Sequence, residues 1–137
     1  MLPKLNGKSF LEISEDDLIT LIDNPDYREN EYIEYKKGFS FLAVTDGRKR
    51  EQQVVEFRND ICSFANSDGG YLIFGISDEG GCAKEIVGID ILDNNTDRFE
   101  LERRNNLTPI LPRAPSVAFH FIKLSNGKYI IILFVKR

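Results

Sequence analysis

The hydrophobic pattern is clearest in the middle of the chain. Apolar residues recur at helical spacing from about Lys49 to Asn66, which predicts one long helix with a buried face. The almost continuous apolar run at Gly70–Ser77 has the length of a strand and predicts one that is covered on both sides. Asn66, Gly69 and Gly70 adopt left-handed backbone angles at low cost, so we expect a tight connection between helix and strand. The residues of the buried helical face are Val54, Phe57, Ile61, Phe64 and Ala65.

The N-terminal part of the chain has weaker patterns. Met1–Phe10 shows no period, so we expect a mobile or loosely docked segment there. A Ser-x-x-Asp capping box followed by apolar residues predicts a short helix at Ser14–Asp23. Tyrosine and isoleucine among charged residues predict a partly exposed strand at Glu29–Lys37. The glycines and aspartate that follow predict a loop at residues 38–48.

The C-terminal half predicts two strands, a helix and a hairpin. Asp78–Gly81 has the composition of a turn, and Lys84–Ile89 is predicted to be a strand that pairs with the buried one. Asn94–Asn106 is predicted to be helical. An Asn-Gly dipeptide is a strong hairpin signal and predicts that Ser116–Leu124 pairs with Lys128–Val135. The expected helix cap and apolar contacts are Thr96, Phe99 and Leu101, and the residues that interrupt regular structure before the hairpin are Pro109, Pro112 and Pro115.

Length and charge narrow the range of functions. A chain of 137 residues with 42% hydrophobic residues is long enough for one domain with its own core. The net charge of −4 argues against a strongly basic nucleic-acid-binding protein. The charge is uneven, however, with −6 over residues 1–34 and +4 over residues 36–50. One local basic segment therefore lies in an otherwise acidic molecule.

Cysteine usage and hydropathy indicate where the protein works. Cys62 and Cys82 are the two cysteines, and they do not form a C-x-x-C motif. Without a secretory apolar segment, this favours a reducing, cytoplasmic location. Since no apolar run approaches the length of a transmembrane helix, we expect no membrane partner.

Three blocks of sequence carry a family resemblance. They are E-N-E-Y-I-E-Y-K at Glu29–Lys36, C-S-F-A-N-S-D-G-G-Y-L-I-F-G-I-S-D at Cys62–Asp78, and I-V-G-I at Ile86–Ile89. In this order they resemble the Schlafen-type Alba-like domain, a family described as DNA-binding and found in bacterial regulators and in Schlafen proteins. The resemblance implies a single α+β domain, in which a small mixed β-sheet packs against one long helix and shorter helices. The structural residues that it implies are Asn66, Gly69, Gly70 and Gly75.

The resemblance also bears on domain organisation. It implies a Schlafen Alba-like domain at residues 29–137, preceded by an N-terminal lead with a short helix at residues 1–28. The chain ends almost directly after its last predicted strand. We therefore expect a domain excised from a longer protein, with a further C-terminal domain in that protein.

A three-carboxylate site is implied by the same resemblance. In the Schlafen branch that cleaves transfer and ribosomal RNA, the nuclease centre holds two glutamates five residues apart and an aspartate after the glycine-bounded strand. Glu29, Glu34 and Asp78 match these positions, so the resemblance implies that they are catalytic and hold Mg²⁺ or Mn²⁺. Carboxylate oxygens suit either metal, which could activate water at a phosphodiester. Glu31 is a competing carboxylate in the same block.

The basic segment supplies candidate phosphate contacts to RNA or DNA. Together with the resemblance, this segment leaves three functions open. They are a nucleic-acid-binding domain of a transcriptional regulator or defence protein, a metal-dependent endoribonuclease, and a regulatory interaction module that serves a missing C-terminal domain. The apolar closing strands could also pair at a sheet edge, which would give a homodimer. The candidate nucleic-acid-binding residues are Lys36, Lys37, Arg48, Lys49 and Arg50.

Overall fold

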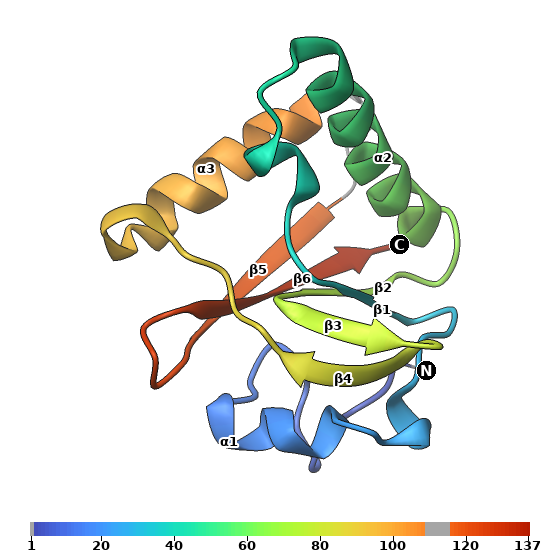
Figure 1. The fold of residues 1–137 in the computed structure, drawn as a ribbon. Helices are drawn as coiled ribbons and strands as arrows, with labels where there is room; N and C mark the ends of the chain where they lie inside the picture. The colour runs from blue at the N-terminus through green and yellow to red at the C-terminus, as the bar shows by residue number, and fades with distance from the viewer. Residues whose placement is uncertain (1, 109–115) are drawn as a thin grey trace.

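The computed structural model describes residues 2–108 and 116–137, and a mixed four-stranded sheet lies at its centre (Figure 1). β1 (Ile33–Lys36) runs parallel to β2 (Gly70–Phe74). β6 (Tyr129–Lys136) runs antiparallel to β2 and to β5 (Ser116–Lys123), which gives the order β1-β2-β6-β5. The α+β class, the mixed sheet and the closing hairpin are confirmed. The predicted break at Pro109, Pro112 and Pro115 lies outside the described residues.

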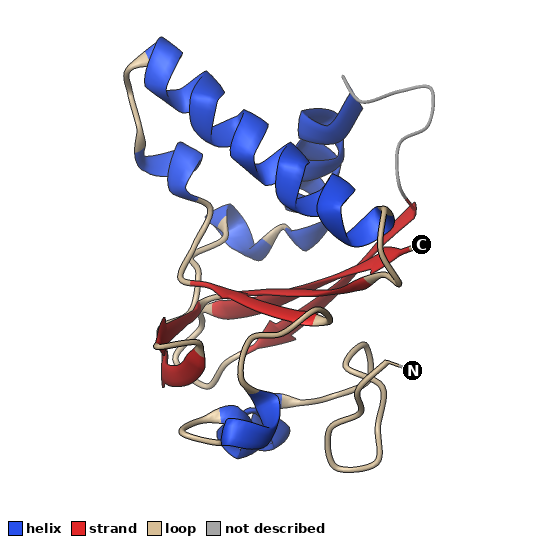
Figure 2. Ribbon diagram, turned by 90° about the vertical axis from the view of Figure 1, so that its right-hand side faces the viewer, coloured by secondary structure: helices blue, strands red, loops and turns tan. Residues whose placement is uncertain are grey.

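The predicted long helix covers one face of this sheet (Figure 2). This helix, α2 (Gly47–Ala65), buries Val54, Phe57, Ile61 and Phe64, as its period predicts. These side chains pack in one cluster with alternate residues of the central strands, such as Leu72 of β2. The stripe on α2 therefore forms the core on the helical side of the sheet.

A second helix, α3 (Thr96–Leu107), lies beside α2 on the same face (Figures 1 and 2). Its N-cap is Asn95, whose side chain accepts a hydrogen bond from the Arg98 N–H, so the prediction of a Thr96 cap was wrong. Phe99 is buried as predicted, but Leu101 is 60% exposed. Residues two positions apart on an α-helix point in directions about 200° apart around the helix axis, so Phe99 and Leu101 cannot both face the sheet.

Arg103 lies one turn beyond Phe99 on α3 and is buried, unlike Leu101. Its guanidinium lies 4.7 Å from the centre of the Phe99 ring and 5.6 Å from that of Phe41. Phe41 belongs to a 3₁₀ turn, η3 (Ser40–Ala43), inside the segment predicted to be a loop. The aromatic residues of this segment are buried, so residues 38–48 are more ordered than the glycine-containing sequence indicated.

The predicted buried strand ends early, because Gly75 has a φ of +103°. The chain turns there and continues as β3 (Ile76–Glu79), which pairs with β4 (Cys82–Ile86) in a separate two-stranded sheet. The predicted partner strand therefore pairs with the last two residues of the predicted buried strand, Ile76 and Ser77, and its Ile89 forms a bridge to Tyr129 of β6. A positive φ of this kind favours glycine, which explains where the long apolar run divides.

The N-terminal segment covers the opposite face of the main sheet (Figure 2). It contains the short helix α1 (Glu15–Leu18) and two 3₁₀ turns, η1 (Ile19–Leu21) and η2 (Pro25–Tyr27). The prediction of a loosely docked segment was wrong, because Leu5 and Phe10 are completely buried. The central strands are apolar on both faces, so the second face also requires a cover. Within the described residues, no helix has the length and apolar composition needed to cross a membrane.

Candidate functional site

An acidic cavity lies between the chain that enters β1 and the C-terminal half of α2. Its volume is about 430 Å³. It brings together the predicted pair Glu29 and Glu34. Glu29 precedes β1, Glu34 lies in β1, and Asp60 of α2 is a third carboxylate in the same cavity. The residues that line it are Glu29, Asn30, Glu31, Ile33, Glu34, Asp60, Ser63, Phe64 and Ser67.

Glu29 is held in place by two backbone contacts. Its N–H donates to the Gly81 carbonyl at 2.8 Å, and its Oε2 accepts a hydrogen bond from the Tyr35 N–H at 3.0 Å. Partial burial raises the pKa of Glu29, and the Tyr35 hydrogen bond partly opposes this change. The negative charges of Asp78 and Glu34 raise the pKa further, so the three predicted carboxylates influence one another.

Asp78 lies outside the cavity, at the exposed end of β3. Its Oδ2 accepts a hydrogen bond from the Gly81 N–H at 3.2 Å, so it closes the β3–β4 turn. Across residues 2–108 and 116–137, no three His, Cys, Asp or Glu side chains come close enough together to hold a metal ion. Glu29, Glu34 and Asp78 each have a protein partner instead. Within residues 2–108 and 116–137, these three carboxylates therefore do not form a preassembled metal site.

Asp60 is the residue of this site that the sequence did not reveal. Its Oδ2 lies 3.3 Å from Nζ of Lys36, which also lies 3.3 Å from Oε1 of Glu34. Burial lowers the pKa of Lys36, but the two carboxylates outweigh burial and the net pKa is raised. Asp60 follows Phe57 by three residues and precedes Phe64 by four, so the sequence could place it beside the buried stripe of α2. Nothing in the sequence indicated which strand it would meet.

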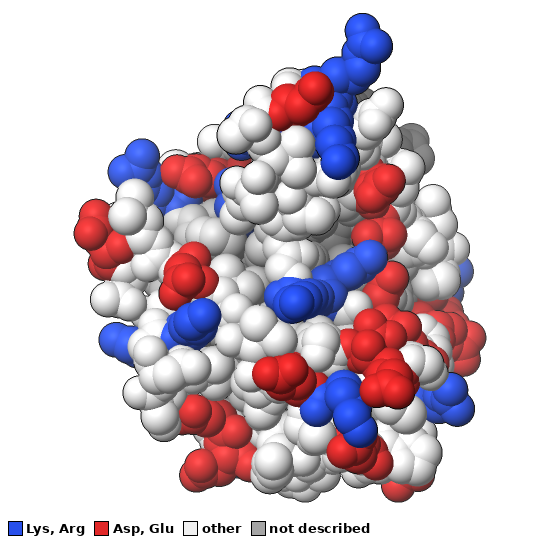
Figure 3. Space-filling view, in the orientation of Figure 1, with Lys and Arg blue, Asp and Glu red and all other residues white. Residues whose placement is uncertain are grey.

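The remaining predicted cations are exposed, and the described residues include no acid that pairs with them. Lys37 directly follows β1, and Arg48, Lys49 and Arg50 form the first turn of α2. None of the four makes an ion pair within the described part of the chain. Figure 3 shows basic surface at the upper end of α2 and across the middle of this face, beside acidic surface around β1 and the β3–β4 turn. Lys36, in contrast, is occupied by two carboxylates.

The predicted structural motif shapes one end of the cavity. Asn66 caps α2 with an ordinary φ of −84°, so only Gly69, with a φ of +82°, uses the left-handed region there. Gly70 is required for another reason. A Cβ atom at this position would meet the Phe64 ring and lie 2.9 Å from the Tyr32 carbonyl oxygen. The missing side chain lets Phe64 approach the entry to β1, where it lines the cavity.

The sequence matches one known protein family. The family described as Schlafen, AlbA_2 matches residues 29–137. The chain belongs to this family. The match begins at Glu29, so the Schlafen AlbA_2 region contains the cavity and the basic segment, whereas the N-terminal cover of the sheet precedes it.

One solved structure with a similar fold is the N-terminal domain of a RecG-related protein from Nitrosomonas europaea, determined by solution NMR. The TM-score is 0.52 and the identity is 21%, over 88% of this Schlafen AlbA_2 chain and 69% of the other chain. The name of that protein refers to an ATP-dependent DNA helicase. At this identity the likeness shows the fold alone. Among curated proteins, none matches this chain.

Proposed function

We propose that this domain binds nucleic acid through phosphate contacts from Lys37, Arg48, Lys49 and Arg50. The observation that carries the proposal is that three of these cations follow one another in the first turn of α2, exposed and without an acidic partner within the described residues. Many other cations are neutralised by ion pairs. These paired cations are Lys8, Lys36, Arg58, Lys84, Arg98, Arg103, Arg104 and Arg137.

The position of these cations supports the same function. Arg48, Lys49 and Arg50 lie at the N-terminal end of a helix of 19 residues, where the helix dipole also favours an anion. Phosphate contacts carry no base sequence, so we expect RNA and DNA to bind with similar, modest affinity. Membership of the Schlafen AlbA_2 family supports a role that involves nucleic acid.

Fluorescence anisotropy with labelled single-stranded RNA, single-stranded DNA and duplex DNA tests the proposal. Four phosphate contacts predict that log Kd rises with log salt with a slope of about 3. Replacing Arg48, Lys49 and Arg50 by Gln should weaken binding at low salt by at least about tenfold and reduce the slope by about two. Absence of binding to all three probes at low salt would overturn the function.

A matched control separates a local surface from a general charge effect. Lys4, Lys123 and Lys136 are exposed and have no ion pair in the described ranges. Changing these three to Gln alters the net charge by the same amount and should change affinity less than about threefold. Equal losses in the two triple variants would contradict the assigned surface.

A metal-dependent endoribonuclease is a second candidate. Two observations favour it: Glu29 and Glu34 share a cavity, and the negative charge of Asp78 contributes to the raised pKa of Glu29. Incubation with transfer RNA and Mn²⁺ tests it, with Glu34→Gln as the variant and Glu31→Gln, in the same cavity, as the control. Cleavage that is lost only in Glu34→Gln, with binding retained, would identify an enzyme. If the chain neither cleaves nor binds nucleic acid, the regulatory interaction module is the remaining interpretation.

A further inference from the structure

Lys36 is placed where a phosphate-binding residue would be expected, next to Lys37, but it is surrounded by negative charge. Its Nζ lies 3.3 Å from Oε1 of Glu34 and 3.3 Å from Oδ2 of Asp60. The three side chains are 31–35% exposed, so solvent reaches all of them. One positive and two negative charges leave this group with a net charge of −1, while Lys37 beside it is unpaired in the described residues.

The pair formed by Lys36 and Asp60 separates the acidic cavity from the basic segment. Asp60 lines the 430 Å³ cavity on one side and a smaller cavity of about 50 Å³ on the other. Lys36 lines only the smaller one, next to η3. The ion pair also joins β1 to α2 across this boundary. A phosphate chain that ran along α2 from its first turn toward the acidic cavity would therefore meet this pair first.

We propose that Asp60 limits the nucleic-acid affinity of this surface by keeping Lys36 neutralised. The inference rests on the proposed function and concerns the regulation of the same surface. A phosphate diester carries one negative charge, whereas Glu34 and Asp60 supply two charges that are already in contact with Lys36. Phosphate therefore competes poorly for Lys36. Without the Asp60 charge, one carboxylate remains against Lys36, and Lys36 joins the cations that are available to phosphate.

The test is the isosteric variant Asp60→Asn, measured by anisotropy with single-stranded RNA and DNA. We expect about three- to tenfold tighter binding at low salt and a salt slope that increases by about 0.7, as for one added phosphate contact. Glu56→Gln is the matched control, because Glu56 lies one helical turn earlier, also borders the smaller cavity and has no ion pair in the described residues. It removes the same charge and should change affinity less than about twofold. Equal gains in the two variants would overturn the inference.

A double-mutant cycle assigns the gain to Lys36. Lys36→Met alone should change affinity less than about twofold, because its charge is already neutralised. In Lys36→Met/Asp60→Asn the gain should disappear. Lys37→Met, made in the otherwise wild-type protein, should weaken nucleic-acid binding. This variant shows that the assay detects the loss of one phosphate contact.

The outcomes separate the two proposals. A wild-type protein that binds no nucleic acid at low salt overturns the proposed function. A wild-type protein that does bind, but loses as much affinity with Lys36→Met as with Lys37→Met, overturns the inference about Asp60. This comparison of the two lysine variants decides the question even if Asp60→Asn fails to fold.

Discussion

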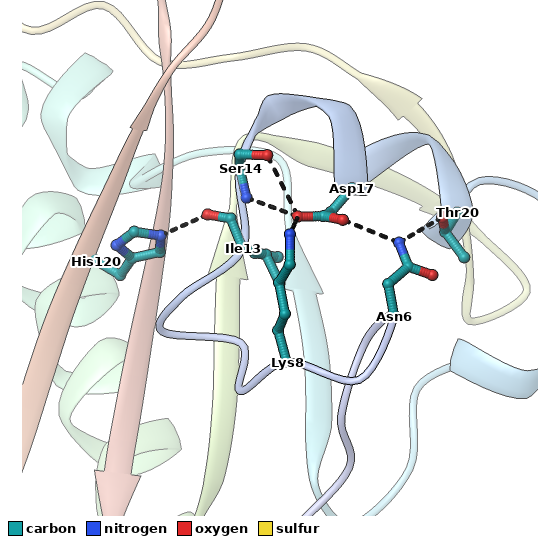
Figure 4. Close-up of polar contacts among 7 residues, drawn as sticks. All are labelled: Asn6, Lys8, Ile13, Ser14, Asp17, Thr20 and His120. Carbon is teal, nitrogen blue, oxygen red and sulfur yellow. Dashed lines mark hydrogen bonds and ion pairs between the residues drawn. The ribbon is translucent and has the colours of Figure 1, made fainter.

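The imidazole Nε2 of His120 lies 2.8 Å from the carbonyl oxygen of Ile13 (Figure 4). Since a carbonyl only accepts hydrogen bonds, Nε2 carries the proton, and the contact ties the middle of β5 to the N-terminal segment. The histidine thus has a structural role. Residues 2–28 are part of the fold, although the family match begins after them.

Deleting residues 1–28 should therefore expose an apolar face of the sheet. Tyr71 and Ile130 lie in one buried cluster with Leu5, Phe10 and Leu18 of α1. We expect the 29–137 fragment to bind the dye ANS strongly and to lose cooperative thermal unfolding in circular dichroism. A fragment with the same Tm as the full chain would show that the N-terminal cover is dispensable.

Phe10→Ala should destabilise the protein by about 3–5 kcal/mol, because Phe10 is completely buried and its ring lies 4.9 Å from that of Tyr71. Urea denaturation measures this change. Ile19→Ala, in the same segment, is the control, since Ile19 is 69% exposed and should cost less than about 0.5 kcal/mol. Similar losses in the two variants would contradict the docking of Phe10.

Asp17 should make stability depend on acid pH. Its carboxylate accepts hydrogen bonds, each 3.0 Å long, from the Ser14 N–H, the Asn6 side chain and the Lys8 ammonium (Figure 4). These contacts, with the Ser14 N–H the largest, hold the pKa of Asp17 well below its usual value.

The stabilisation from the ionised Asp17 is therefore fully present above about pH 4, the ordinary pKa of Asp in the unfolded chain, and is lost as the pH falls toward the folded pKa. Asp17→Asn should lower Tm at pH 7 and make Tm depend less on pH below about 4. The control is Asp16→Asn, at an exposed neighbouring position. If Tm changes with pH below 4 in the same way in Asp17→Asn and in the wild type, the assignment is incorrect.

Gly70→Ala should destabilise the protein by about 1–3 kcal/mol through overpacking against Phe64 and the Tyr32 carbonyl. Gly47→Ala is the matched control, because nothing lies within 4 Å of a Cβ atom at Gly47, in the first turn of α2. There alanine should be neutral or slightly stabilising. Chemical denaturation compares the two, and a harmless Gly70→Ala would disprove the proposed close approach.

Elements with a strong local pattern could be predicted from the sequence. The stripe at Val54, Phe57 and Ile61 can form only on a helix, and an Asn-Gly turn between apolar strands defines the β5–β6 hairpin. The buried Phe10 had no such pattern. Its burial depends on a sheet face built by residues of β1, β2 and β6 that are distant in the sequence, which no local period records.

In the candidate site, too, some residues could be predicted from the sequence and others could not. Glu29 and Glu34 were found because they lie five residues apart in a recognisable block, and the structure brings both to one cavity. Asp60 was missed because its contact with Lys36 depends on how α2 crosses β1.

The sequence alone determined the long helix, the central strands, the closing hairpin and the chemical character of the acidic and basic segments, since each follows from neighbouring residues. It indicated the fold class through the family resemblance. Only the tertiary structure decided which charges meet. It paired Lys36 with Asp60, left Lys37 and the first turn of α2 exposed, and kept Asp78 outside the cavity. Electrostatic interactions depend on distance in space, and spacing along the chain does not fix that distance for residues on different elements.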